Sequence, residues 1–453
     1  MVWFRRWMRC CYAGSEQTER ELVLRNRALL LVPGLISATV YMAVTLRLPW
    51  WSYGGTLQSW ARLLGDGREG FGLSLAGLGV LVVAYLWGWQ IVRSGRGKRW
   101  IIWGFAGLFA ATLFWLMPIT SDLFTYLSQA HMFTDLGGNP LVDAPLDFND
   151  PLVLAYPTFY ASHPTAYGPA WLLMSAPGTL GPWDVVAGLL YLKGLSVTAF
   201  FGCAWLLERI LQMLRPASVM EGLYLFTWNP LVLVMAAGDG HNDIVMMVLV
   251  LLSVWFVLRE RWLLAFGALT LSIWIKYVSL ILFPLLVLHV WQRSAGKQGS
   301  ERWVPLVGGG LVVAFVTVCV FVPFWDPENA LRMVERFLWP VNWHQGGTHL
   351  SSWAMGAGLL LFAVVWGILI RRLMPGDGSA QPLMNAGFTA SLLAFVLGAA
   401  RSQTWHLIWP LALAGLSDRR WAWPMVVALT ALMLAVQVWV EWGAPGAAIA
   451  SSG

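Results

Sequence analysis

The sequence predicts an all-α integral membrane protein, a polytopic bundle of about thirteen transmembrane helices. Of the 453 residues, 58% are hydrophobic and only 11% are charged, whereas charged residues make up about 25% of an ordinary soluble domain. The apolar residues also form runs such as 28–48, 71–92 and 304–322, each with the roughly 20 residues that a helix needs to cross the hydrocarbon core. A large soluble helical protein of this composition would have almost no polar surface.

The chain begins with a basic segment, residues 1–27, that we expect on the cytoplasmic surface of the membrane. Six arginines and the lack of an apolar run distinguish it from a cleavable signal peptide. The first apolar run, 28–48, then serves as an uncleaved anchor. The net charge of +6 comes from residues in short loops between apolar runs. This is the positive-inside pattern and does not indicate a nucleic-acid partner.

The positive-inside rule orders the remaining segments across the bilayer. Basic loops at 93–99, 293–302 and 418–420 all fall on the cytoplasmic side when the apolar runs are threaded in turn. The expected helices are 28–48, 71–92, 100–118, 185–207, 220–237, 243–258, 262–275, 277–291, 303–323, one that ends at Arg371, two that form a hairpin around Arg401, and 421–441.

The same threading defines the domain organisation. Residues 28–441 form one membrane domain, with no internal repeat and no linker to a separate soluble domain. Two long loops, about 119–182 and 324–349, are expected outside the cytoplasm and carry short helices. The C-terminal tail, 442–453, lies on the same outer side, while the N-terminus is cytoplasmic.

Unusual polar residues gather at the outer ends of the predicted helices. Asp122 follows the helix 100–118, Lys276 lies between two apolar segments, and Arg401 lies in the last outer hairpin. Placing ionisable residues near the ends of apolar membrane helices costs free energy, so such residues tend to mark functional sites. The other candidates on this face are Tyr126, His163, Tyr167, His241, Asn242, Asp243 and His406.

Each candidate also has a purely structural interpretation. Asp122 or Asp243 could cap a helix, Lys276 and Arg401 could reach the lipid headgroups, and the histidines could be surface residues. The combination is more informative than its members, because an acid, two cations and a polar turn all lie on one face of the membrane.

A carboxylate facing cations beside lipid suits the transfer of a group from a lipid phosphate. Lysine and arginine bind phosphate through charge-assisted hydrogen bonds and stabilise the charge that develops as the bond breaks. A phosphate diester leaves readily, so the reaction mainly needs a base for the acceptor hydroxyl. Direct displacement inverts the sugar carbon, by analogy with inverting glycoside hydrolysis. The sequence has no glycine-rich loop for a nucleotide, which favours a lipid-linked donor.

Several short segments occur in a recognisable order over about residues 120–410. They are Ser121–His131 with Asn139-Pro140, Thr165–Pro169, Gly240–Asp243, Ile275–Tyr277 and Trp405–Pro410. Together they resemble the GT-C superfamily of membrane glycosyltransferases, and in particular the bacterial polyprenol-phosphate-mannose-dependent α-1,6-mannosyltransferases of lipoglycan assembly.

The resemblance implies an inverting enzyme of the bacterial inner membrane with an extracytoplasmic active site. Its donor would be a polyprenyl phosphate sugar, with mannose favoured, and its acceptor a glycan or glycolipid. The acid of the first outer loop acts as general base, which falls on Asp122, while Lys276, Arg401 and His241 bind the donor phosphate. No cofactor and no required metal are expected, because no second carboxylate adjoins Asp122 in the sequence. The residues expected to bind substrates are Tyr126, His163, Tyr167, Asn242, Asp243 and His406.

Some features leave alternatives open. Thr404-Trp405-His406 stands where the family usually has a Pro-Trp-Tyr type sequence, which affects His406 and the choice of sugar. The short segments 262–275 and 277–291 also fit the discontinuous helices of a transporter or flippase for lipid-linked sugars. Transport would place charges near the midplane, whereas these lie at one face. Transfer of glucose, arabinose or an oligosaccharide is a further alternative, and a scaffold would leave the clustered charges unexplained.

Overall fold

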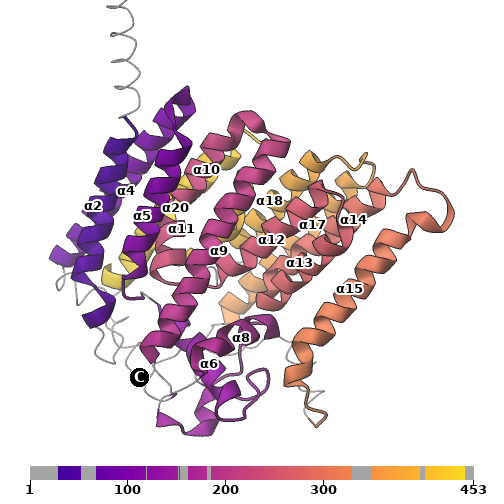
Figure 1. The fold of residues 1–453 in the computed structure, drawn as a ribbon, viewed down its shortest axis with the longest axis horizontal. Helices are drawn as coiled ribbons and strands as arrows, with labels where there is room; N and C mark the ends of the chain where they lie inside the picture. Colours follow the sequence, from indigo (N-terminus) through magenta and orange to yellow (C-terminus); the bar gives the residue numbers. More distant parts are fainter. Residues whose placement is uncertain are drawn as a thin grey trace, which may run out of the picture.

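The computed structural model describes residues 29–52, 68–118, 120–151, 153, 162–180, 185–328, 349–397 and 403–443. Within these ranges the regular structure is helical, apart from an isolated antiparallel bridge between Pro49 and Leu116. The helices form one bundle, with α6 (Asp122–Thr134) and α8 (Pro169–Ser175) together at one end (Figure 1). The predicted all-α fold class is confirmed for the described residues.

Every predicted membrane segment overlaps a helix of the structure. The first part of the chain contributes α2 (Leu31–Arg47), α4 (Arg68–Ile91), α5 (Arg99–Phe114), α9 (Val185–Leu214), α10 (Val219–Thr227), α11 (Pro230–Leu233), α12 (Asp243–Leu258) and α13 (Trp262–Ile275). The second part contributes α14 (Phe283–Arg293), α15 (Val304–Phe321), α17 (His349–Leu373), α18 (Ala380–Leu397), α19 (Ile408–Ala414) and α20 (Ala422–Gly443).

Helix length and composition alone identify fewer than thirteen membrane crossings among the described residues. Six of the described helices are long and apolar enough to cross a membrane, or seven when the bent pair α10–α11 counts as one span. Five further apolar helices have only 10 to 17 residues. A helical membrane protein is thus confirmed, whereas thirteen crossings stay a prediction.

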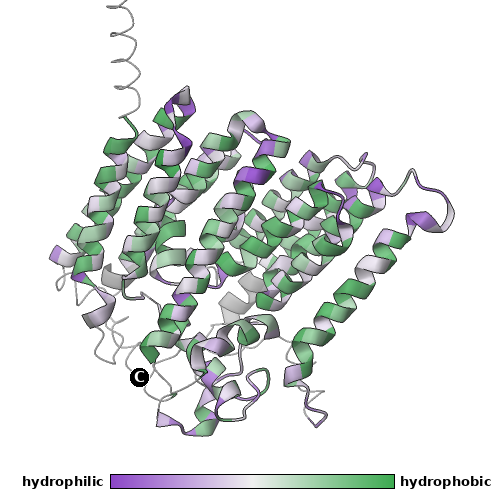
Figure 2. Ribbon diagram, in the orientation of Figure 1, coloured by the Kyte–Doolittle hydropathy of each residue, from purple (hydrophilic) through white to green (hydrophobic). Residues whose placement is uncertain are grey.

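Apolar residues cover the outside of the bundle as well as its interior. Figure 2 shows hydrophobic residues in green along the helices and hydrophilic residues in purple at helix ends and in loops. The span Val304–Phe324, which contains α15, has a mean hydropathy of 2.4 but is only 17% buried. Because lipid tails are the solvent that suits such a surface, α15 is expected to face the bilayer.

The predicted helix 220–237 is broken in the structure. Its two halves, Pro216–Thr227 and Pro230–Gly238, meet at an angle of 53°. Asn229 caps the second half, because its side chain accepts hydrogen bonds from the backbone N–H groups of Leu231 at 3.0 Å and Val232 at 3.1 Å. Pro230 also disfavours a helical conformation at the residue before it. The break makes the polar turn after Gly238 part of the bundle interior.

The first outer loop folds onto the end of the bundle. In α6, the residues from Asp122 to Met132 are all buried. The backbone N–H of Gly168 donates to the carbonyl of Ile275 at 3.1 Å, and a Cβ atom at Gly168 would lie 2.0 Å from the carbonyl oxygen of Trp274. Only glycine allows this close approach, which fixes the start of α8 against the end of α13.

Three predicted segments fall largely outside the described residues. They are the basic segment 1–27, the C-terminal tail 442–453 and most of the second outer loop, 324–349. Their predicted positions relative to the membrane stay predictions.

Candidate active site

Asp122 lies at the start of α6, on the inner side of the folded outer loop, and is only 6% exposed. The hydroxyl of Tyr167 donates to its Oδ2 atom at 3.3 Å. Nδ1 of His241 lies 3.3 Å from the same oxygen. Oδ2 of Asp122 therefore accepts a hydrogen bond from Tyr167 and lies within ion-pair distance of His241, whose Nδ1 makes no hydrogen bond.

The turn after the broken helix forms a second part of the site. Nε2 of His241 lies 2.7 Å from Oδ2 of Asp239. Thr120 donates to both oxygens of Asp239, through its backbone N–H and its hydroxyl, each at 3.0 Å. Gly240 allows the turn through its φ of +72°, and its carbonyl accepts from the hydroxyl of Ser196 at 3.0 Å.

The charges in this turn stabilise one another. Burial raises the pKa of Asp239, but the charge of His241 and the hydrogen bonds from His241 and Thr120 outweigh burial and lower the pKa below its ordinary value. Burial also lowers the pKa of His241, yet the carboxylates of Asp239 and Asp122 raise it to about 9. His241 is thus an imidazolium at neutral pH.

A buried ion pair forms the third part of the site. Nζ of Lys276 donates to both oxygens of Asp243, each at 2.9 Å, and Nε1 of Trp409 donates to Oδ1 at 2.5 Å. The ammonium also lies 5.9 Å from the ring centre of Tyr167 and 5.7 Å from that of Trp409, which is within cation–π range. Tyr167 therefore contacts both the Lys276 ammonium, through its ring, and the Asp122 carboxylate, through its hydroxyl.

Aromatic rings from the 3-10 turn Thr404–Leu407 cover the site. Trp405 stacks on His241 with ring centres 4.1 Å apart, and His406 stacks on Trp409 at 4.5 Å. Burial and the positive charge of Lys276 lower the pKa of His406 to about 3. His406 is therefore neutral at working pH and can recognise a substrate only through hydrogen bonds or packing.

Some buried polar atoms have no protein partner. Both side-chain polar atoms of Asn242 and the hydroxyl of Tyr126 are buried without a hydrogen bond. Tyr126 lies edge-on to Tyr167, with ring centres 4.9 Å apart. Burying such groups unsatisfied is costly, so they are candidates for contacts with a bound sugar.

Most of the residues predicted from the sequence meet in this site. Asp122, Tyr126, Tyr167, His241, Asn242, Asp243, Lys276 and His406 lie in its three parts or directly beside them. His163 lies in the loop before Tyr167, where its Nδ1 is 2.9 Å from the hydroxyl of Ser162, and the contacts described for it do not join it to the carboxylates. Arg401 falls outside the described residues.

Two residues of the site were not among the predicted site residues. Asp239 stands two residues before His241, a spacing that lets both side chains meet in one turn. Trp409 lies in the segment Trp405–Pro410, and its hydrogen bond to Asp243 depends on α12 and α19 lying together. The described residues contain no cluster of three His, Cys, Asp or Glu side chains arranged to hold a metal ion.

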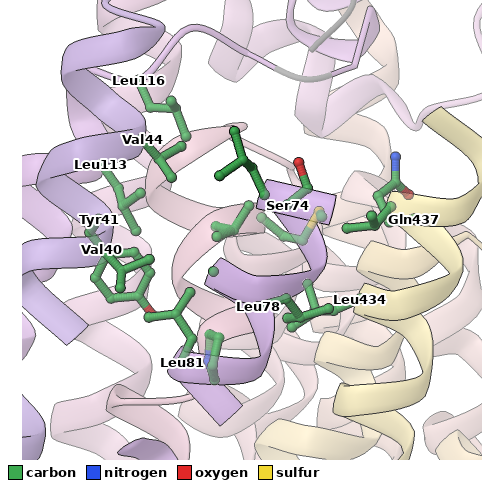
Figure 3. A pocket seen from close by; sticks show the side chains of 16 residues that line it. Val40, Tyr41, Val44, Ser74, Leu78, Leu81, Leu113, Leu116, Leu434 and Gln437 are labelled. Carbon is green, nitrogen blue, oxygen red and sulfur yellow. The ribbon is translucent and has the colours of Figure 1, made fainter. Parts of the chain in front are cut away.

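An apolar cavity of about 150 Å³ lies next to the site, between α2, α4, α5, α11 and α20 (Figure 3). One wall residue is bonded to the site, since the carbonyl of Met235 accepts from the backbone N–H of His241 at 3.0 Å. Of the other wall residues, Gln437 accepts from the hydroxyl of Thr404, in the turn that covers the site, at 2.8 Å, and the carbonyl of Leu116 accepts from Lys193. Its walls suit a hydrocarbon chain and contain no charged residue.

Comparison with known proteins gives the family. Residues 30–292, more than half of the chain, match the family model of the N-terminal domain of α-(1→6)-mannopyranosyltransferases. The chain is 25% identical to α-(1→6)-mannopyranosyltransferase A of Mycobacterium tuberculosis over 391 residues, which span 77% of this chain and 72% of that protein.

Two proteins of Corynebacterium glutamicum match shorter stretches. The chain is 25% identical to α-(1→6)-mannopyranosyltransferase A over 192 residues, 42% of this chain and 39% of that protein. It is 26% identical to α-(1→6)-mannopyranosyltransferase B over 199 residues, 41% of this chain and 33% of that protein. The matched residues 30–292 include Asp122, Asp243 and Lys276. The chain belongs to the α-(1→6)-mannopyranosyltransferase family.

Proposed function

We propose that the chain transfers a mannosyl group from a polyprenyl phosphate donor to a hydroxyl group of a glycan or glycolipid acceptor. Membership of the family makes it a membrane mannosyltransferase. The lipid-linked donor, the inverting mechanism and the extracytoplasmic face are parts of the proposal. The observation that carries it is that one residue, Tyr167, contacts both the Asp122 carboxylate and the Lys276 ammonium.

In the proposed reaction Asp122 is the general base. It takes the proton of the acceptor hydroxyl while the acceptor oxygen forms a bond to the anomeric carbon of mannose. The bond from that carbon to the phosphate oxygen breaks, and its electron pair stays on the phosphate. The product therefore has the opposite anomeric configuration to the donor, by analogy with inverting glycosidases.

Lys276 is the proposed phosphate ligand among the described residues. Its ammonium carries three hydrogens, and its two bonds to Asp243 leave one for a phosphate oxygen. Charge on the leaving phosphate grows during the reaction, so this cation stabilises the transition state more than the ground state. Arg401 remains the proposed second cation.

The surroundings of the site favour a lipid-linked substrate. The nearby cavity is lined by apolar side chains such as Val44, Leu78 and Leu434, which suit a hydrocarbon chain and would leave the phosphates of a nucleotide without partners. The unpaired polar atoms of Asn242 and Tyr126 suit the hydroxyl groups of a sugar.

One observation favours the alternative of a transporter. The bent pair α10–α11 resembles the discontinuous helices that transporters use at their substrate sites. A transporter would move the lipid-linked sugar across the bilayer without breaking the sugar–phosphate bond, so the two activities are separable by experiment.

The test uses the purified chain in lipid nanodiscs with an α-mannoside acceptor. Polyprenyl phosphate mannose and guanosine diphosphate mannose are compared as donors, and the anomeric configuration of the product is determined by NMR. We expect transfer from the lipid donor alone, with inversion. Transfer from the nucleotide donor would contradict the proposal. So would translocation of a fluorescent lipid-linked sugar in vesicles without any transfer.

A further inference from the structure

His241 lies between two carboxylates that come from different parts of the fold. Its Nε2 is 2.7 Å from Asp239, in the same turn, and its Nδ1 is 3.3 Å from Asp122, on α6. The ring is fully buried, and Trp405 covers one of its faces. Nε2 is bonded to Asp239, whereas Nδ1 makes no hydrogen bond and faces the carboxylate of Asp122. A phosphate oxygen at Nδ1 would lie beside that carboxylate, which argues for a role other than the predicted phosphate contact.

We infer that His241 is a positioning residue that holds the base Asp122 as an imidazolium, and that Asp239 orients it from the other side. The inference rests on the proposed function of Asp122. The chain of contacts runs from Thr120 through Asp239 and His241 to Asp122.

The protonated form of His241 is the one that this geometry requires. An imidazole donates through both nitrogens only when it carries the second proton. Asp239 has no hydrogen to donate because it is ionised: the charge of His241 and the hydrogen bonds from His241 and Thr120 lower its pKa. A neutral imidazole would therefore turn a lone pair toward one of the two carboxylates, which is repulsive in a buried site.

The charged groups around His241 favour its protonated form. The groups facing His241 are Asp122 from α6, Asp239 from its own turn, Asp243 from the start of α12, His406 from the 3-10 turn and, next to Asp239, Lys193 from α9. The two nearest carboxylates raise the pKa of His241 to about 9 against the effect of burial. The proton is therefore present below pH 9 and is lost above it.

In the proposed reaction, protonated His241 fixes the orientation of the Asp122 carboxylate. Tyr167 and His241 both contact Oδ2 of Asp122, so the carboxylate cannot rotate freely and its other oxygen is presented to the acceptor. During transfer the acceptor proton moves to Asp122, while His241 keeps both of its protons. Loss of the imidazolium proton would release the carboxylate and slow the reaction.

The test is the pH dependence of transfer by the full chain in nanodiscs, with polyprenyl phosphate mannose as donor. The wild-type rate should fall as pH rises through about 9. In Asp239→Asn the decline should begin about one pH unit lower or more, because the imidazolium loses a counter-charge. In His241→Gln, kcat should fall about ten- to hundredfold with the donor KM within about twofold, and the decline near pH 9 should vanish.

Ser196→Ala provides the matched control. It removes a buried hydrogen bond from the same turn, to the carbonyl of Gly240, without removing a charge. We expect it to lower thermal stability and to leave the alkaline decline in place. An alkaline decline that is the same in wild type, Asp239→Asn and His241→Gln would overturn the inference.

A double variant separates action through Asp122 from a general structural effect. In an Asp122→Asn background, a further His241→Gln change should alter the residual rate by less than about threefold, since residues that act as a unit are not additive. An additive loss would show that His241 acts independently of Asp122. If the wild type shows no transfer, the proposed function fails; if it transfers but these effects are missing, only the inference fails.

Discussion

At the scale of single residues, the ion pair between Lys276 and Asp243 is the contact of the site whose disruption we expect to destabilise the fold most. Asp243 is fully buried, and Lys276 and Trp409 supply its hydrogen bonds. Removing one member of a buried pair leaves an uncompensated charge, at a cost of about 3–5 kcal/mol. Variants can therefore separate the structural contribution of the pair from the proposed role of Lys276 in binding the donor phosphate.

Lys276→Met should lower both stability and activity, because Asp243 loses its counter-charge. The double change Lys276→Met with Asp243→Asn removes both charges, so it should regain most of the thermal stability and none of the transfer activity. Melting temperature and transfer rate of the purified variants check this. Recovery of activity in the double variant would show that Lys276 does not act on the donor phosphate.

The predicted residues that the structure brings together are ones whose type is unusual at their position, and their roles stay predictions. Asp122 and Lys276 stand out because charges near apolar helix ends are rare, and the structure places them around Tyr167. Asp239 is equally charged but lies in a turn with several polar residues, so its pairing with His241 became evident only from the folded turn. Trp409 is one of 30 tryptophans and has no local feature that distinguishes it.

At the scale of elements, the contact of α8 with the end of α13 positions Tyr167. The outer loop approaches so closely at Gly168 that a Cβ atom would collide with the backbone of Trp274. Apolar runs predicted the helices, because length and composition determine membrane helices. They did not reveal the break at Asn229, where a side-chain cap and Pro230 compete with a continuous helix.

Gly168→Ala should therefore displace the loop and separate Tyr167 from Asp122 and Lys276. We expect at least about a tenfold loss of kcat, because small displacements of positioning groups have large effects on rate. Gly194→Ala is the control, since a Cβ atom there meets nothing within 4 Å. Equal transfer rates in the two variants would contradict the positioning role of this contact.

At the scale of the whole molecule, α6 and α8 of the folded outer loop lie at one end of the bundle (Figure 1), and Asp122 is the first residue of α6. The distribution of basic loops predicts that this end is extracytoplasmic. Composition predicted the helical membrane fold, and the charge pattern predicts a direction in the membrane that stays a prediction. They could not predict how the helices pack, because lipid-facing and buried helix surfaces are both apolar.

Cysteine labelling tests the orientation. In a chain whose native cysteines are replaced by alanine, Leu146→Cys in the outer loop should react with a membrane-impermeant maleimide in intact cells. Leu146 is 47% exposed, so the thiol is accessible. Ser300→Cys, in the exposed loop between α14 and α15, should react only after permeabilisation. The reverse pattern would place the site in the cytoplasm and exclude the proposed donor face.

The central claim is that Asp122 is the base of a lipid-donor mannosyltransferase, and the transfer rate of Asp122→Asn tests it most directly. The amide keeps the shape of the side chain but cannot take a proton, so the rate should fall about 10²- to 10⁴-fold. Asp147→Asn, at an exposed aspartate of the same loop, should transfer at the wild-type rate within about twofold. If folded Asp122→Asn retained more than about a tenth of the wild-type rate, another group would have to be the base and the account would be wrong.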